Sequence, residues 1–360
     1  MASKTPEMAT NEFKLQYKRF RAKKSQFDLT DVIDFSLPHQ YSLIEKWKKT
    51  FEVSSQRKSV DSETDSRSRA ACFGLKSPET WQIYQISSNP GFLYIVNPFS
   101  DGSQYYWCQR CVLDYPCLPN VCNLDAHVSR SKQSFWDVHR SIKESGSLLS
   151  DSPLMKLHWV TLGYHYDWDK KVYHKDIKSE FPDDLAGLSH FVAETVGFLD
   201  FRPEAAIVNF YHMDSAIGGH TDHSEFDLSA PLLSFSFGQE AIFLLGGESL
   251  FTKPVAIRVR SGDIMVMSGA SRLCYHAVPR IMRNVNCSYG PSAGDSLALP
   301  GCSLSCSDGV DSLLLHCSPS GWQGVGQDSQ LLIDYMHNSR ININVRQVLS
   351  TNGTFPSEDV

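Results

Sequence analysis

The chain has 360 residues, of which 41% are hydrophobic and 21% are charged, and its formal net charge is −6. This composition is typical of a globular protein with a sizeable core, and it excludes a wholly disordered chain. No apolar run approaches the roughly 18 residues of a membrane span and the N-terminus has no apolar signal segment, so we expect an intracellular protein, neither membrane-bound nor secreted. Because the whole chain is acidic, a nucleic-acid partner would require a local basic surface.

The N-terminal segment, residues 1–80, is expected to contain a basic helix and a linker. Lysine and arginine residues surround three aromatic side chains between Phe13 and Lys24. This pattern predicts an amphipathic helix that either packs through its aromatic residues, touches nucleic acid or contributes to organelle import. Residues 54–69 are Ser-rich and charged with almost no apolar side chains, which predicts a loop or linker.

Ten cysteines without a secretory signal are expected to be reduced thiols. Four of them lie between Cys108 and Cys122, and a second group with one histidine lies between Cys302 and Cys317. A structural zinc site usually needs two closely spaced cysteine pairs, and only the first group contains one C-x-x-C pair. Buried or free thiols are therefore favoured over zinc.

The clearest helix is predicted over residues 183–197. Apolar residues lie along one face, Asp183 after Pro182 is the candidate N-cap, and Gly197 ends the pattern. Beyond this helix the apolar period changes from that of a helix to that of a strand. Short strands rich in Val, Ile and Phe are expected at 204–211, 231–238, 240–246, 254–260, 263–268, 272–279 and 340–348.

These strands follow one another without alternating helices, which disfavours a doubly wound α/β fold. The pattern predicts a mainly β protein with flanking helices, either a β-sandwich or a jelly roll. Residues 284–330 interrupt it with Gly, Ser and Pro, which predicts a long insertion.

A possible metal site lies at His220 and Asp222. On an extended chain, residues two positions apart point to the same face. If His276 joined them from a distant strand, the three would form a 2-His-1-carboxylate triad of the kind that holds Fe(II) and leaves open coordination positions. The alternative is an ordinary surface pair. His212 and His223 are expected to face away from these ligands.

A second polar pattern lies near the C-terminus. Read at period two, Arg340, Asn342, Asn344 and Arg346 share one face of a strand, opposite three apolar residues. Arginine and asparagine are depleted from strand interiors, and a buried guanidinium needs a partner. The row is therefore either a solvated sheet face or a pocket for an anion such as 2-oxoglutarate, since guanidinium groups match carboxylates.

Taken together, Asn209-x-Tyr211, His220-x-Asp222, His276 and the Arg340-to-Arg346 segment resemble the AlkB family of Fe(II)- and 2-oxoglutarate-dependent dioxygenases, over roughly residues 156–350. The resemblance implies a double-stranded β-helix core, use of Fe(II), 2-oxoglutarate and O2, and His220, Asp222 and His276 as catalytic metal ligands. It implies that Arg340 binds the carboxylate remote from the metal and Arg346 the metal-bound end. The cosubstrate would be held by Asn209, Phe210, Tyr211, Arg340, Asn342, Asn344 and Arg346.

The resemblance also divides the chain into the N-terminal segment 1–80, a nucleotide-recognition lid and core extension at 81–182, and a catalytic core at 183–360. Aromatic side chains of the lid would stack on a flipped base. An alternative is that they only close the core. The substrate-binding candidates are Trp136, Tyr164, His165 and Tyr166.

The substrates that the resemblance implies are N-methylated bases, such as 1-methyladenine in tRNA and N6-methyladenine in DNA. It further implies a mitochondrial or nuclear location, and we expect a monomer. Three alternatives stay open: a protein hydroxylase or demethylase with the same iron chemistry, a non-catalytic RNA-binding jelly roll, and a metal-free β-sandwich interaction module. Arg272, Arg280 and Arg283 are candidate phosphate contacts, with surface solvation as the commoner alternative.

Overall fold

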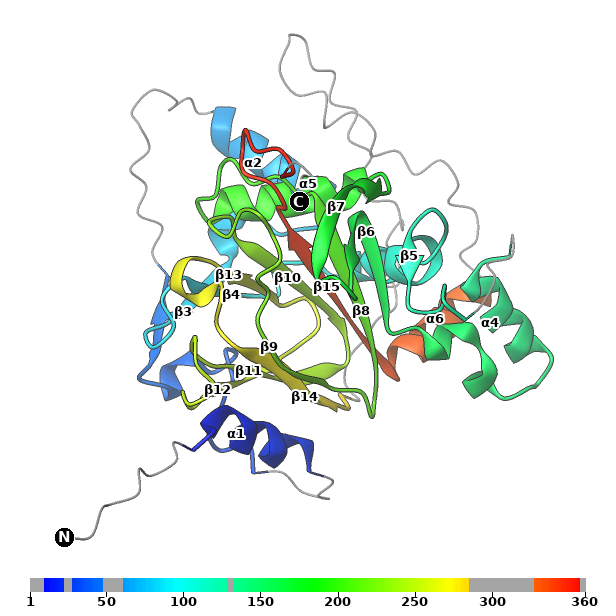
Figure 1. Ribbon diagram of the computed structural model, residues 1–360, viewed down its shortest axis with the longest axis horizontal. Coiled ribbons are helices and arrows are strands. Elements are labelled where there is room, and N and C mark those ends of the chain that lie inside the picture. Colours follow the sequence, from blue (N-terminus) through cyan, green and yellow to red (C-terminus); the bar gives the residue numbers. More distant parts are fainter. Residues whose placement is uncertain (1–9, 23–27, 48–60, 128–132, 285–326, 357–360) are drawn as a thin grey trace.

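The computed structural model describes residues 10–22, 28–47, 61–127, 133–284 and 327–356, with side chains placed from residue 66 onwards in the third range. Two β-sheets face each other, and helices cover both outer sides (Figure 1). None of the described helices has the length and apolarity needed to cross a bilayer. The helices are α1 (Glu12–Arg21), α2 (Asp61–Cys72), α3 (Ser103–Gln109), α4 (Phe135–Glu144), α5 (Asp183–Thr195) and α6 (Gln327–Met336).

The larger sheet has the strand order β2-β3-β4-β13-β10-β15-β8-β6-β5, and β7 pairs with β6. Its strands are β2 (Ile44–Lys46), β3 (Gln82–Ile86), β4 (Phe92–Val96), β5 (Val121–Cys122), β6 (Trp159–Asp167), β7 (Val172–Lys178), β8 (Ala205–His212), β10 (Leu232–Gly238), β13 (Ile264–Met267) and β15 (Ser339–Arg346).

The smaller sheet has the order β1-β12-β11-β14-β9. Its only parallel pair in the described part of the chain joins β1 to β12. Its strands are β1 (Val32–Ile33), β9 (Ile217–His220), β11 (Glu240–Leu245), β12 (Val255–Val259) and β14 (His276–Met282).

Three apolar layers hold this arrangement together. Between the sheets, Tyr94 and Met265 of the larger sheet share a buried cluster with Phe243 and Ile257 of the smaller sheet. Helices α2 to α6 bury the outer face of the larger sheet in the most extensive cluster. The protein is therefore a jelly roll, which confirms the predicted mainly β class with flanking helices.

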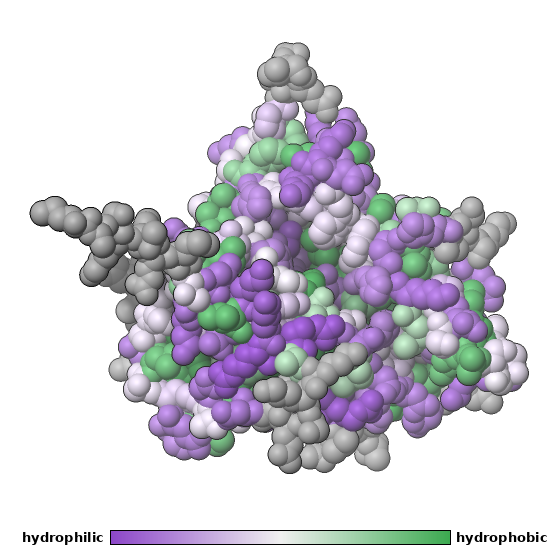
Figure 2. Space-filling view, turned by 60° about the horizontal axis from the view of Figure 1, so that its bottom comes forward, coloured by the Kyte–Doolittle hydropathy of each residue, from purple (hydrophilic) through white to green (hydrophobic). Residues whose placement is uncertain are grey.

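The outer face of the smaller sheet is covered by α1 through Phe13 and Phe20. The ring of Phe13 lies against Gly219 beside β9's last residue and against Gly246 after β11. The opposite side of the helix exposes basic residues, and Figure 2 shows that hydrophilic side chains predominate on this face of the molecule. The structure thus confirms the amphipathic basic helix and its docking through aromatic residues.

Most predicted elements are present. The helix predicted from Asp183 is α5, and six of the seven expected strands lie within two residues of β8, β10, β11, β12, β13 and β15. The prediction for 272–279 is only partly correct, because residues 272–275 form a turn and an irregular segment and the strand runs from His276 to Met282. Pro182, whose extended backbone precedes the first helical turn, is the N-cap of α5 in place of Asp183.

The predicted linker at 54–69 is wrong where the structure describes it, because residues from Asp61 onwards form α2. Tertiary contacts explain this helix better than its composition does. Ala70 is completely buried in the core, and Arg69 pairs with Glu194 of α5 at 2.7 Å. The N-terminal part of the stretch, up to residue 60, lies outside the described residues.

Two further predictions concern cysteines and the insertion. Cys108, Cys111 and Cys122 are buried, and none belongs to a candidate metal cluster in the described part of the chain. Cys72 is disulfide-bonded, so the expectation of reduced thiols is wrong for this residue. The insertion predicted at 284–330 lies almost wholly outside the described residues, although α6 already begins at Gln327.

Candidate metal and cosubstrate site

The three predicted metal ligands converge between β9 and β14. These strands are antiparallel, and their register sets His220 opposite His276, while Asp222 follows two residues after His220. One donor atom from each of the three side chains lies within 4.8 Å of the other two. The imidazole ring centroids are 4.3 Å apart, and His276 Nε2 is 3.5 Å from Asp222 Oδ2. This convergence is the geometry that the His-x-Asp…His spacing predicts.

Hydrogen bonds aim the donor atoms inwards. Nδ1 of His220 lies 2.9 Å from the carbonyl oxygen of Gly218, and Nδ1 of His276 lies 3.1 Å from that of Cys274. Because a carbonyl oxygen only accepts, each Nδ1 carries the proton and each Nε2 keeps a lone pair. These two nitrogens and one carboxylate oxygen fit the facial donor set of Fe(II).

The surroundings of Asp222 favour its ionised form, which is the form that binds a metal ion. Its Oδ1 accepts a hydrogen bond of 2.9 Å from Arg346, whereas its buried Oδ2 has no hydrogen-bond partner among the described residues. Burial by itself would raise the pKa of Asp222, but the adjacent Arg346 guanidinium holds this pKa well below its usual range. Burial and the neighbouring His276 lower the pKa of His220, which favours the neutral form that binds metals.

The triad opens into a cavity of about 490 Å³ between the two sheets. Strands β8, β10, β13 and β15 form one wall, and β9, β11 and β14 form the other. The cavity is large enough for a small diacid together with part of a substrate. Its polar lining includes all three triad residues, Asn209, Tyr211, Ser234, Arg340, Asn342, Asn344 and Arg346.

The row predicted on β15 lines this cavity. All four of its Arg and Asn side chains border the cavity, while Ile341, Ile343 and Val345 are completely buried on the other face of the strand. The same alternation on β8 directs Asn209 and Tyr211 into the cavity. Phe210, expected to bind the cosubstrate, instead packs in the core behind the sheet, since neighbouring strand residues point to opposite faces.

Arg340 and Arg346 occupy opposite ends of the row. Arg340 is 2% exposed and donates to Ser236 Oγ at 2.8 Å and to the Gln239 carbonyl at 3.2 Å. Arg346 contacts Asp222 directly, so it marks the metal end of the cavity. Arg346 thus lies at the triad end of the row and Arg340 at its other end, and the carboxylate that each would bind stays a prediction.

The structure separates the four substrate-binding candidates. Tyr166 lines the cavity and packs at 4.9 Å, edge to face, on Trp168, which is 44% exposed. Tyr164 shares the Tyr166 face but contacts Phe355 instead. His165 points to the other face, where it is buried and hydrogen-bonded to Thr161.

Trp136 does not lie at the cavity. It is 4% exposed on α4, where it stacks on His139 within the core behind the larger sheet. The helical period accounts for this burial, because Phe135, Trp136 and His139 form the inward face of α4. Sequence reasoning missed Trp168 and Lys171 as lining residues; their signal was the Tyr-x-Trp continuation of the lid strand.

The sequence predicts three arginines, Arg272, Arg280 and Arg283, as phosphate contacts or as solvated surface residues. Arg272 is 2% exposed and pairs with Glu225 at 2.8 Å, so neither expectation holds for it. Arg280 donates to the carbonyl oxygens at the end of α1, Phe20 and Ala22. Arg283 is exposed and contacts Asn338.

His212 and His223, which the sequence predicts to face away from the metal ligands, are not in the candidate cluster. His223 borders the cavity but bonds to its neighbour Thr221, and His212 lies on the opposite face of β8 from Tyr211, near Tyr335.

Comparison with known proteins agrees with this geometry. The model of the family described as the 2OG-Fe(II) oxygenase superfamily matches residues 91–346. The human protein named nucleic acid dioxygenase ALKBH1 is 40% identical over all of this chain and 90% of its own length. The Arabidopsis thaliana protein named DNA N(6)-methyladenine demethylase ALKBH1A is 32% identical over 74% of this chain and 77% of its own.

A Schizosaccharomyces pombe protein named tRNA demethylase abh1 is 47% identical over 37% of this chain and 45% of its own length. The family match covers more than half of the chain, and the similarity to the human protein extends over the whole length of this chain. The chain therefore belongs to the AlkB family within the 2OG-Fe(II) oxygenase superfamily, and it is a dioxygenase that uses Fe(II), 2-oxoglutarate and O2.

Proposed function

We propose that this protein is an oxidative demethylase of N-methylated bases in nucleic acid. The observation that carries the proposal is the convergence of His220, Asp222 and His276 at one end of a cavity whose other end holds Arg340. The substrate class is supported by relatives whose names specify nucleic acid, DNA N6-methyladenine and tRNA. We infer 1-methyladenine in tRNA and N6-methyladenine in DNA as the first substrates to test.

In this proposal the triad holds Fe(II), and the β15 row holds 2-oxoglutarate. Once bound, iron and cosubstrate would supply oxidation by O2: one oxygen atom enters the succinate formed with CO2 from 2-oxoglutarate, and the other enters the N-methyl group, which leaves as formaldehyde. The guanidinium of Arg340 binds the distal carboxylate, and that of Arg346 neutralises the metal-proximal end. Burial raises the pKa of Tyr211 to about 12, so its hydroxyl stays protonated and can donate a hydrogen bond to the diacid. Asn209, Asn342 and Asn344 complete the polar wall.

The protein's second task is to orient the base and exclude water. Tyr166 and the half-exposed Trp168 form an aromatic rim on which an extruded base can stack. Lys171 borders the same opening and can meet the phosphate backbone. Tyr164 supports the rim from the same face of β6, whereas burial of Trp136 and His165 confines these two to packing roles.

The test is formaldehyde release from a panel of methylated oligonucleotides with Fe(II), 2-oxoglutarate and O2. We expect turnover of at least one methylated base, loss of turnover in His276→Ala, and a decrease of about 5- to 150-fold in kcat/KM in Trp168→Ala. Methylated histone-like peptides serve as the competing substrate class. Turnover of peptides alone would favour a protein demethylase, and the absence of succinate with any substrate would contradict an enzymatic role.

Three further predictions concern the division of the chain into segments, its location in the cell and its oligomeric state. The lid at 81–182 and core at 183–360 are proposed as functional divisions, although strands from all three predicted segments share the larger sheet. Mitochondrial or nuclear location and a monomeric state stay predictions.

A further inference from the structure

A buried carboxylate that belongs to neither the triad nor the cosubstrate row lies directly behind the metal site. Glu225 is 4% exposed and its side chain is completely enclosed. Its Oε2 accepts a hydrogen bond of 2.8 Å from Arg272, and its Oε1 accepts from Arg346 at 3.2 Å. The hydroxyl of Tyr173 also donates to Oε1, at 3.3 Å. Glu225 therefore bridges two buried guanidinium groups.

These two arginines hold Asp222 at two different points. Arg346 donates to the side-chain oxygen Oδ1 at 2.9 Å, and Arg272 donates to the backbone carbonyl oxygen at 2.6 Å. Arg272 also reaches the carbonyl of Ala230. A metal ligand is thus fixed in both its backbone and its carboxylate by a pair of cations whose shared anchor is Glu225.

The charges of this cluster balance. Two guanidinium groups, Arg272 and Arg346, face two carboxylates, Asp222 and Glu225, and all four side chains are at most 10% exposed. Removing one partner from a buried network leaves the opposite charge uncompensated. Without the charge of Glu225, one excess positive charge would lie beside the position where a dication binds.

We propose that Glu225 is a positioning residue of the metal centre, which fixes the orientation of Asp222 through Arg346 and Arg272 and balances the charge of these two arginines. This inference rests on the metal site of the proposed function. Glu225 touches neither metal nor substrate. Its role is to keep Arg346 from drawing Asp222 Oδ2 away from the other two donors and to cancel the charge of the second arginine.

Substitution Glu225→Gln preserves size and removes the charge. Loss of a group that orients a metal ligand typically lowers metal affinity 10- to 100-fold. We expect Glu225→Gln to raise the Kd for Mn²⁺, used as an air-stable substitute for Fe(II), by at least 10-fold.

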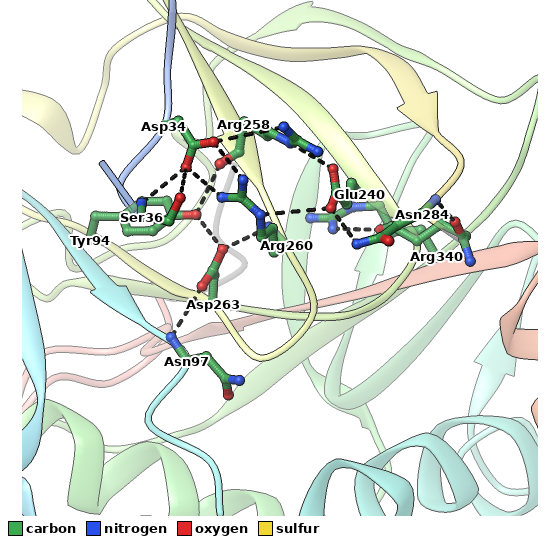
Figure 3. A network of polar contacts seen from close by, with 11 residues as sticks. Asp34, Ser36, Tyr94, Asn97, Glu240, Arg258, Arg260, Asp263, Asn284 and Arg340 are labelled. Atoms are coloured by element: carbon green, nitrogen blue, oxygen red, sulfur yellow. Dashed lines mark hydrogen bonds and ion pairs between the residues drawn. The ribbon is translucent and has the colours of Figure 1, made fainter. Parts of the chain in front are cut away.

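The chain contains a matched control at the far end of β11. Glu240 is also buried, 1% exposed, and it also lies between two arginines, Arg258 at 2.7 Å and Arg260 at 3.7 Å (Figure 3). Glu240 pairs with Met282 in the sheet, whereas His276 pairs with Leu245 at the other end of the strand. Glu240→Gln removes the same buried charge but is remote from the triad.

The experiment measures Mn²⁺ binding to metal-free protein by titration, together with the unfolding temperature without metal. Wild type, Glu225→Gln, Glu240→Gln, Tyr173→Phe and His276→Ala are compared. We expect both Gln variants to unfold at lower temperature, but only Glu225→Gln to bind Mn²⁺ at least 10-fold more weakly. Tyr173→Phe removes one hydroxyl from Glu225 and should weaken Mn²⁺ binding two- to fivefold.

Equal Mn²⁺ affinity in wild type and Glu225→Gln, or an equal loss in both Gln variants, overturns the inference. If Glu225→Gln does not fold, Tyr173→Phe decides, and unchanged affinity in that variant overturns it. Failure of the metal site itself is distinguishable, because wild type would then bind no Mn²⁺ or would bind it as His276→Ala does.

Discussion

At the scale of single residues, the two arginines of β15 differ in what they touch. Arg346 contacts Asp222, Glu225 and Tyr173, and so belongs to the metal end. Arg340 donates to Ser236 Oγ on β10 and to the carbonyl oxygen of Gln239, which follows that strand. We therefore expect substitution of Arg346 to weaken metal binding and substitution of Arg340 to weaken binding of the diacid.

We expect Arg340→Lys to raise the KM for 2-oxoglutarate about 10-fold, which corresponds to about 1.4 kcal/mol of binding energy. Lysine keeps the charge but lacks the planar fork that binds a carboxylate through two parallel hydrogen bonds. The steady-state KM for 2-oxoglutarate checks this, and the Kd for Mn²⁺ is the control that should not change. An unaltered KM would remove Arg340 from the cosubstrate site.

The sequence was most informative where residue types are unusual for their environment. Charged and amide side chains alternating with Ile341 and Ile343 predict a polar wall, and the structure contains it. Phe210 and Trp136 were misplaced because an aromatic side chain suits both a core and a binding rim. Glu225 could not be recognised, since its importance depends on two arginines that are distant in sequence.

At the scale of elements, the short strand β1 is fastened to the smaller sheet by the residues that follow it. Asp34 receives two hydrogen bonds from Arg260, at 2.6 and 2.5 Å (Figure 3). Phe35 stacks on Tyr94 with ring centroids 4.0 Å apart. Asp263 accepts from Tyr94 and from the backbone nitrogens of Arg260 and Asn97. This polar network joins the N-terminal segment to the sandwich.

We expect Asp34→Asn to lower the free energy of unfolding by about 1–3 kcal/mol at pH 7, as is typical of a lost charge-assisted hydrogen bond. Burial alone would raise the pKa of Asp34, but hydrogen bonds from Arg260 and Ser36 hold it well below its usual value of 3.8. Because the pKa of Asp34 is lower in the folded than in the unfolded protein, its ionised form stabilises the folded state at pH values above the unfolded-state pKa. This stabilisation is lost as the pH falls towards the folded-state pKa.

The difference in unfolding free energy between wild type and Asp34→Asn should therefore be complete above about pH 5 and shrink as the pH falls below about 4. Chemical denaturation at several pH values measures it. A difference that grows towards low pH would contradict the ion pair with Arg260.

Elements were predictable when the apolar period was sustained over most of their length, as in α5, β8 and β15. The period does not specify which strands become neighbours, so the pairing of β4 with β13 and the entry of β2 and β3 into the larger sheet were not foreseen. Helix α2 was missed for a similar reason, because its stability depends on Ala70 docking onto distant residues.

At the scale of the whole molecule, the cavity lies between the two sheets, and residues of both sheets line it. Metal ligands come from the smaller sheet and its flanking loop, whereas the guanidinium groups come from the larger sheet. Metal and diacid therefore bind to both layers at once, and their binding energy should add to the stability of the sandwich.

We expect Mn²⁺ together with 2-oxoglutarate to raise the unfolding temperature, and a chelator to reverse the rise. Ligands present at about 100 times their Kd stabilise a protein by about 2.7 kcal/mol. Thermal denaturation followed by circular dichroism measures the shift. His276→Ala should show no response to Mn²⁺, and an equal shift in that variant would place the bound metal elsewhere.

The position of the Phe13 ring between Gly219 and Gly246 limits which substitutions these three residues can accept. A Cβ atom added at Gly219 would lie 2.7 Å from one edge of the ring, and one added at Gly246 would lie 2.8 Å from the opposite edge. If the Phe13 ring shifted away from a methyl group at one of these positions, it would move towards the backbone at the other. Alanine at either glycine should thus be harmful alone yet tolerated beside a smaller residue at position 13, so that these three positions evolve as one unit and link the N-terminal helix to the strand that carries His220.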